Sequence, residues 1–161
     1  MSDSDKSLAI PKLKEEGNKL YEEGEYEKAA ECYFDALCFI EEQLMKEKPN
    51  STMWQAQVDK KVPILLNYAQ CMLYKKEYVE VIRHCSAVLQ YKPDSVKAYF
   101  RRGKAYAHTW DVKEAKADLE KVAELDPSLA KTVDKEIKAL MQRVKEKDTE
   151  EKLRLRGKMF T

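Results

Sequence analysis

Glycine and proline are scarce in this sequence, which has four glycines and five prolines in 161 residues. Turns between β-strands usually consume these two residue types, so their scarcity favours an all-helical fold. No apolar run approaches the roughly 20 residues that a membrane-spanning helix needs. The polar start, residues 1–5, is unlike a signal peptide. We therefore expect a cytoplasmic chain without membrane contacts.

A surplus of charge of one sign is also missing, since 30 Lys and Arg residues face 29 Asp and Glu residues. A net charge near zero gives no general reason to expect nucleic acid or an acidic membrane as a partner. Hydrophobic residues make up 43% of the chain, and its length is enough to bury the core of one domain. Any electrostatic function must therefore come from where the charged residues lie.

Sequence motifs of catalysis and metal binding are absent as well. There is no Gly-rich phosphate loop, no Gly-x-Ser-x-Gly and no His placed to activate a nucleophile, so we expect no enzyme. His84 and His108 lack partners at metal-ligand spacing, so no metal or other cofactor is expected. Without Cys-x-x-Cys spacing, four reduced core thiols are expected: Cys32, Cys38, Cys71 and Cys85.

A repeat with a period of 34 residues is present. Pro93 and Pro127 lie 34 residues apart, and each closes a similar phrase, VLQYKP and VAELDP. An earlier unit carries matching landmarks at Leu13, Gly17, Leu20, Gly24, Tyr26, Ala29, Tyr33 and Ala36. A 34-residue period with small, aromatic and proline landmarks is the signature of the tetratricopeptide repeat, which has one helix-turn-helix per period. The chain is predicted to form an all-α tetratricopeptide-repeat superhelix.

Three repeats are predicted within residues 10–127, at about 10–61, 62–95 and 96–127, after a lead-in segment of residues 1–9. The first is about 18 residues longer than the period, which indicates a long second helix, a loop at residues 48–51 and a helix capped by Ser51 or Thr52. Pro63 would either bend that helix or begin it, and the sequence leaves both open.

Residues 128–161 are predicted to form an extended C-terminal helix and tail, which brings the count to seven helices. Apolar residues at helical spacing should cover the open end of the stack: Leu129, Val133, Ile137, Leu140, Met141 and Val144. Residues 145–152 contain no apolar residue, so the end of this helix should extend into solvent.

Polar residues on the first helix of each repeat are predicted to share one groove, because these helices line the concave side of such a superhelix. Lys14 and Asn18 are four residues apart and share a helix face. Lys97 and Arg101 do the same two repeats later, and Asn67 occupies the place in the second repeat that Arg101 holds in the third. Such a set of donors suits a terminal carboxylate with an adjacent Asp side chain.

Simpler explanations exist for each residue alone. Lys97 and Arg101 could form a solvated helix face. Asn67 is more informative, because Asn is a poor residue for a helix interior. Tyr21 and Gln70 each follow one of the asparagines by three residues, and they either contact side chains of a bound peptide or pack within the repeat.

Residues 10–127 resemble carboxylate-clamp tetratricopeptide domains, whose pattern is Lys-x-x-x-Asn, then Asn, then Lys-x-x-x-Arg. The complete pattern is present in this chain at Lys14, Asn18, Asn67, Lys97 and Arg101. The resemblance implies that these five residues bind the Glu-Glu-Val-Asp tails of cytosolic heat-shock chaperones of the ninety- and seventy-kilodalton classes.

Several segments are also similar to the family of the aryl-hydrocarbon-receptor-interacting protein, an immunophilin-like co-chaperone with a photoreceptor-type paralogue. They are residues 65–71, 96–100, 124–127 and 156–157, and the similarity extends over nearly the whole chain. It implies an FK506-binding-like domain before the repeats, so we expect this chain to be a C-terminal fragment.

The same resemblance implies an adaptor that links the chaperone to a client such as a ligand-activated transcription factor. The last helix then becomes a second contact region, for the client, with Arg154, Arg156 and Phe160 as candidate residues. The rival hypothesis is a general helical-repeat scaffold that binds internal peptide segments. Nucleic-acid binding in the groove is disfavoured, because exposed aromatic residues are not interleaved with the basic ones.

Overall fold

The structure is a computed structural model that describes residues 1–160, apart from the side chain of Phe160. Within these residues the chain forms seven α-helices and one short 3-10 helix, and no strand. The elements are α1 (Asp3–Glu22), α2 (Tyr26–Met45), α3 (Thr52–Tyr74), α4 (Tyr78–Tyr91), α5 (Val96–His108), α6 (Val112–Leu125), η1 (Pro127–Leu129) and α7 (Ala130–Phe160). The predicted all-α superhelix of three helical hairpins and a C-terminal helix is confirmed.

The three hairpins turn in the same way. Each has one residue with positive φ between its helices: Gly24 at 81°, Lys76 at 62° and Trp110 at 63°. This left-handed conformation closes a helix, and glycine adopts it most easily. Lys76 and Trp110 are one 34-residue period apart in the sequence, whereas Gly24 and Lys76 are separated by a longer interval.

The extra residues of the first repeat lengthen two helices. α2 has 20 residues and α3 has 23, against 14 in α4 and 13 in α5. Ser51 caps α3 as predicted, since its side chain accepts a hydrogen bond from Trp54 N at 3.2 Å. Pro63 lies inside α3, which begins well before it and continues after it. The proline therefore does not begin the helix.

The N-terminal residues extend α1 beyond the predicted repeat. The helix starts at Asp3, because Ser2 and Asp5 form a reciprocal capping box. Residues 3–9, expected to lead into the first repeat, are therefore the first turns of α1. An ion pair between Asp3 and Lys46, at 2.5 Å, joins this extension to the end of the long α2.

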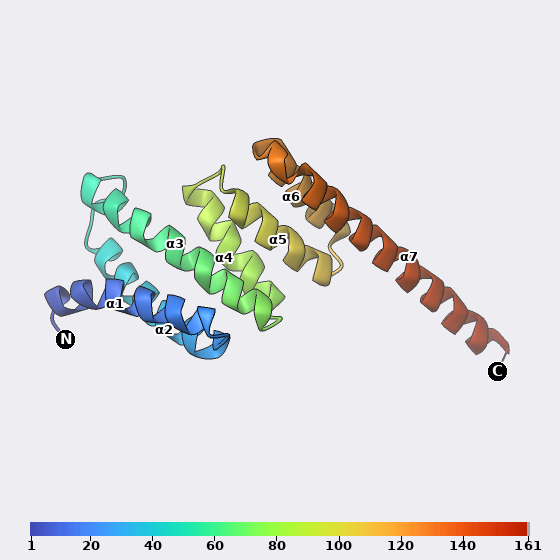
Figure 1. Ribbon diagram of the computed structural model, residues 1–161, viewed down its shortest axis with the longest axis horizontal. Helices are drawn as coiled ribbons and strands as arrows, with labels where there is room; N and C mark the ends of the chain where they lie inside the picture. The colour runs from blue at the N-terminus through green and yellow to red at the C-terminus, as the bar shows by residue number, and fades with distance from the viewer. Residues whose placement is uncertain (161) are drawn as a thin grey trace.

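The helices stack along the long axis of the molecule, and α7 projects from one end (Figure 1). α1 contacts α3, and α3 contacts α5, so the first helices of the three hairpins lie next to one another. The second helices pack behind them and bury large side chains such as Tyr33, Ile40 and Val81. One side of the superhelix is therefore formed by α1, α3 and α5.

α7 has 31 residues and is about 46 Å long. Val133 and Leu140 are buried, and Val133 packs with Leu119 of α6. Met141, expected to cover the stack, is 46% exposed, so that prediction is wrong. It follows Leu140 directly and is turned about 100° away from it around the helix. From residue 145 to 159 every residue is exposed, as predicted for the segment without apolar residues.

All four cysteines are free thiols. Cys71 and Cys85 are buried and Cys32 is partly buried, but Cys38 is exposed, so the prediction of four core thiols is wrong for Cys38. Burial raises the pKa of Cys71 to about 11 and that of Cys85 to about 12, because removal of water disfavours the thiolate. The two buried thiols therefore stay protonated at neutral pH.

Candidate functional site

A cavity of about 310 Å³ opens where the first helices of the repeats meet α2. It is lined by Asn18, Tyr21, Glu22, Tyr33, Asn67, Gln70 and Arg101. The structure therefore brings together three of the five predicted donors and both of the predicted flanking residues. The other two predicted donors, Lys14 and Lys97, are not among the lining residues.

Arg101 is the cation of this cavity. Its Nε donates to Gln70 Oε1 at 2.7 Å, and its Nη1 donates to the carbonyl oxygen of Leu66 at 3.1 Å. Within the described part of the chain, no carboxylate pairs with this guanidinium. Burial lowers the pKa of Arg101, because loss of water disfavours its charge, yet an arginine stays protonated in proteins. A half-buried cation held by neutral partners favours the arrival of an anion.

The two asparagines form one hydrogen-bonded unit with Tyr33. Asn18 Oδ1 accepts from the Tyr33 hydroxyl at 2.5 Å and from Asn67 Nδ2 at 3.2 Å. With its oxygen engaged in this way, Asn18 has its Nδ2 group available to donate. Asn67 Oδ1 forms no hydrogen bond among the described residues and is available to accept. The pair therefore offers a ligand both a donor and an acceptor.

The two predicted flanking residues have structural as well as cavity-lining roles. Gln70 orients the guanidinium of Arg101 through the bond described above. Tyr21 packs edge-on against Tyr26 and Tyr74, whose rings are stacked 4.2 Å apart. Burial, together with a hydrogen bond to Tyr74, raises the pKa of Tyr21 to about 12. Tyr21 therefore packs within the repeat and Gln70 holds Arg101, and both residues also line the cavity.

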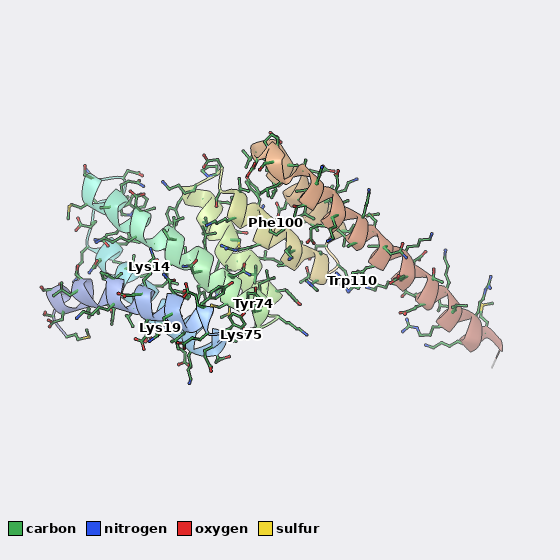
Figure 2. The ribbon with its side chains drawn as sticks, viewed as in Figure 1. Lys14, Lys19, Tyr74, Lys75, Phe100 and Trp110 are labelled. Carbon is green, nitrogen blue, oxygen red and sulfur yellow. The ribbon has the colours of Figure 1, made fainter. Side chains whose placement is uncertain are left out.

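Lys14 and Lys97 stand on the same helices as two of the cavity residues. Each precedes a cavity residue, Asn18 or Arg101, by one helical turn on the same helix face. Lys97 is exposed and Lys14 is partly exposed, and within the described chain neither takes part in an ion pair. Figure 2 labels Lys14 on α1. A lysine side chain is long and flexible, so either ammonium could reach a ligand in the cavity.

Two cavity residues were not predicted from the sequence. Glu22 contributes a carboxylate to the lining, and no sequence signal indicated it. Tyr33 was read only as a packing landmark of the first repeat. A signal for its second role did exist, because a buried tyrosine usually needs a partner for its hydroxyl, which a phenylalanine would not.

The residues proposed for client contact belong to the C-terminal part of α7, which extends away from α1, α3 and α5 (Figure 1). Arg154 and Arg156 are both exposed, and Arg154 pairs with Glu151 on its own helix, at 3.6 Å. The third candidate, Phe160, lies outside the described side chains. Leu153 and Leu155 are 61% and 53% exposed. This end of the helix therefore presents apolar and basic groups to solvent.

Among the described residues, no helix combines the length and the apolar character required to cross a bilayer. No three His, Cys, Asp or Glu side chains among them are grouped so that they could hold a metal ion.

The arrangement of the helices defines a tetratricopeptide-repeat superhelix. The tetratricopeptide repeat family model matches residues 96–129. Over 158 residues the chain is 43% identical to aryl-hydrocarbon-interacting protein-like 1 of Bos taurus. The aligned region covers 98% of this chain and 48% of that protein. The chain thus spans about half the length of the curated relatives it matches.

Solved structures with the same fold include the C-terminal TPR-containing domain of a putative FK506-binding protein of Plasmodium falciparum. It is 27% identical with a TM-score of 0.79, covering 92% of this chain and 97% of that one. The first TPR of Spaghetti (RPAP3), bound to HSP90 peptide SRMEEVD, is 26% identical with a TM-score of 0.65, covering 86% and 94%. The second TPR domain of human RPAP3, in complex with HSP70 peptide SGPTIEEVD, is 25% identical with a TM-score of 0.65, covering 84% and 98%.

Proposed function

We propose that this chain is the chaperone-binding part of a cytoplasmic co-chaperone of the aryl-hydrocarbon-receptor-interacting type. Its groove binds the C-terminal Glu-Glu-Val-Asp tail of heat-shock chaperones of the ninety- and seventy-kilodalton classes. The observation that carries the proposal is Arg101, a half-buried guanidinium that faces the cavity without a carboxylate partner. The chain acts as an adaptor rather than as an enzyme.

The chemistry of the lining suits such a tail. A terminal carboxylate accepts hydrogen bonds from Asn18 Nδ2 and from the free edge of Arg101, while Asn67 Oδ1 accepts a peptide N–H. Lys14 and Lys97 are within reach of the adjacent Asp side chain at the margin. Charge-assisted bonds of this kind contribute roughly 1.5–3 kcal/mol each, so a few of them support micromolar binding, about −8 kcal/mol, after ordering costs.

The comparisons support the choice of ligand. Two structures with the same fold carry peptides that end in Glu-Glu-Val-Asp, one from HSP90 and one from HSP70. The match to aryl-hydrocarbon-interacting protein-like 1 supports the assignment to the aryl-hydrocarbon-receptor-interacting type. By the same resemblance, the exposed end of α7 contacts a client such as a ligand-activated transcription factor, through the region of Arg154, Arg156 and Phe160.

A second candidate function is a scaffold for internal peptide segments, and one observation favours it. A mainly apolar cavity of about 390 Å³ lies between α2, α3 and α4, away from the first. Its lining includes Phe34, Leu37, Leu65 and Tyr68, and Phe34 is 53% exposed. An internal segment has no terminal carboxylate, so it would use apolar side chains there instead.

The test of the proposed function is calorimetric titration of a peptide ending in Glu-Glu-Val-Asp into the chain and two variants. Arg101→Ala removes the cavity cation and should weaken binding by at least about tenfold. Arg83→Ala is the matched control, because it makes the same change of net charge at an exposed i,i+3 pair with Glu80 on α4. Equal affinities for the two variants would favour the scaffold function.

A further inference from the structure

We propose that Tyr33 determines which chemical class of ligand the cavity accepts. It does so by fixing the side-chain amide of Asn18 with its nitrogen toward the ligand, which selects a carboxylate over a neutral carboxamide. This inference rests on the proposed function, because it concerns the same cavity. It adds a specificity-determining residue that does not belong to the five-residue clamp pattern.

Tyr33 reaches Asn18 from the second helix of the hairpin. Its side chain is 1% exposed, and its hydroxyl lies 2.5 Å from Asn18 Oδ1. The ring packs against α1 at Gly17, where a Cβ would come within 2.6 Å of Tyr33 Cε1. Glycine at this place therefore lets the hydroxyl come within hydrogen-bond distance of Asn18, the residue that follows Gly17 in α1.

The hydrogen bonds of Tyr33 and Asn67 favour one orientation of the Asn18 amide. Burial raises the pKa of the Tyr33 phenol, so the hydroxyl keeps its hydrogen and needs an acceptor. Asn67 Nδ2 donates to the same oxygen of Asn18 from α3. If the amide turned over, its NH2 group would face these two donors, and a buried O–H would lose its acceptor, which is unfavourable.

The fixed orientation has a direct consequence for the ligand. Asn18 Nδ2 and Arg101 both present donors to the cavity, and a carboxylate can accept from both. A carboxamide would place its own NH2 donor against one of them. Without the Tyr33 hydroxyl, the Asn18 amide could turn its oxygen toward the cavity and accept from a carboxamide. Part of the discrimination between the two ligand classes should therefore depend on this hydroxyl, beside the part that comes from the charge of Arg101.

The experiment compares Tyr33→Phe with Tyr99→Phe, each of which removes only a hydroxyl. Tyr99 is the matched control, since its hydroxyl bonds the Pro93 carbonyl oxygen at 3.0 Å on an exposed surface. Dissociation constants are measured for a Glu-Glu-Val-Asp peptide as free acid and as C-terminal amide. The acid-to-amide preference should fall about tenfold in Tyr33→Phe and stay unchanged in Tyr99→Phe.

A double variant tests whether Tyr33 acts on the ligand preference through Asn18. In an Asn18→Ala background, Tyr33→Phe should no longer change the preference, because the group on which it acts is gone. A further loss in that background would overturn the inference. So would unchanged Asn18 side-chain NH2 resonances in the NMR spectrum of Tyr33→Phe.

The outcomes for the proposed function and for this inference differ. If the unaltered chain binds acid and amide equally, both fail. If the unaltered chain prefers the acid and Tyr33→Phe keeps the whole preference, only the role of Tyr33 fails.

Discussion

Arg102 and Asp118 form a two-armed ion pair, with Arg102 Nε 2.7 Å from Asp118 Oδ2 and Nη2 2.8 Å from Oδ1. The neighbouring residue, Arg101, points to the other side of α5, into the cavity, and has no carboxylate partner among the described residues. Two consecutive arginines therefore differ in role. The charge of Arg102 is neutralised by the fold, whereas the charge of Arg101 is available to a ligand.

The pair of Arg102 and Asp118 is predicted to be important for stability. Asp118 is 5% exposed, so its removal by Asp118→Ala leaves a partly buried cation unpaired and should cost roughly 3 kcal/mol in the free energy of unfolding. Urea unfolding measures the change. Glu120→Ala is the control, because its exposed pair with Lys116 is long, at 3.9 Å, and should contribute less than about 0.5 kcal/mol. Similar losses in both variants would refute the assignment.

Gly17→Ala should destabilise the first hairpin. The added Cβ would come within 2.6 Å of the Tyr33 ring, which is buried and cannot move away freely, so a loss of roughly 1–3 kcal/mol is expected. Gly157→Ala is the contrasting variant. No atom lies within 4 Å of a Cβ there, so the same change should raise the helicity of α7 without lowering the melting temperature. Unchanged unfolding of Gly17→Ala would contradict the packing described.

The repeat architecture could be predicted from the sequence because its signals are local. The 34-residue offset between Pro93 and Pro127 predicted the third hairpin, and Ser51, the cap of α3, was one of the two predicted caps. The capping box of Ser2 and Asp5 is equally local, and it starts α1 at Asp3, within the residues 1–9 that were predicted only as a lead-in segment. The course of the chain at Pro63 was not decidable, because tertiary packing of α3 determines whether a helix continues through a proline.

Stability should fall between pH 7.5 and pH 6.0, although no carboxylate with an ordinary pKa titrates in this range. Burial, reinforced by Arg83, holds the pKa of His84 below 6.5, while Glu80 opposes the shift. The unfolded chain then binds more protons as the pH falls toward 6, so stability is full at pH 7.5 and is lost on acidification. The chain has two histidines, and the pKa of the more exposed His108 is lowered as well.

Melting temperatures measured across this range check the prediction. His84→Gln should flatten the dependence more than His108→Gln, because His84 is the more buried of the two. If the melting temperature of His84→Gln changed with pH as steeply as that of the unaltered chain, the explanation would be wrong.

The far end of α7 should be dispensable for folding and for binding of the chaperone tail. A chain that ends at Asp148 keeps the contacts of Arg143 and Lys147 with Trp110, and the described side chains that it loses, at residues 149–159, are all exposed. Its free energy of unfolding should change by less than about 0.5 kcal/mol, and its affinity for the peptide should not change. Leu140→Ala, which truncates a buried side chain of the same helix, should cost about 2–4 kcal/mol. A comparable loss in the shortened chain would show that the end of α7 is part of the folded unit.

The candidate site was predictable only in part. Helix periodicity placed Asn18, Asn67 and Arg101 on adjacent helices, and all three line the cavity. Periodicity could not place the ends of Lys14 and Lys97, because a long side chain can reach many points from one backbone position. It could not find Tyr33 either, since that contact joins two helices through a hydroxyl whose distance depends on tertiary packing.

The central claim is that the cavity binds a free carboxyl terminus. The most direct measurement is calorimetry on the unaltered chain with one Glu-Glu-Val-Asp peptide prepared as the free acid and as the C-terminal amide. We predict micromolar affinity for the acid and binding at least about tenfold weaker for the amide. Equal affinity for the two peptides would contradict the account.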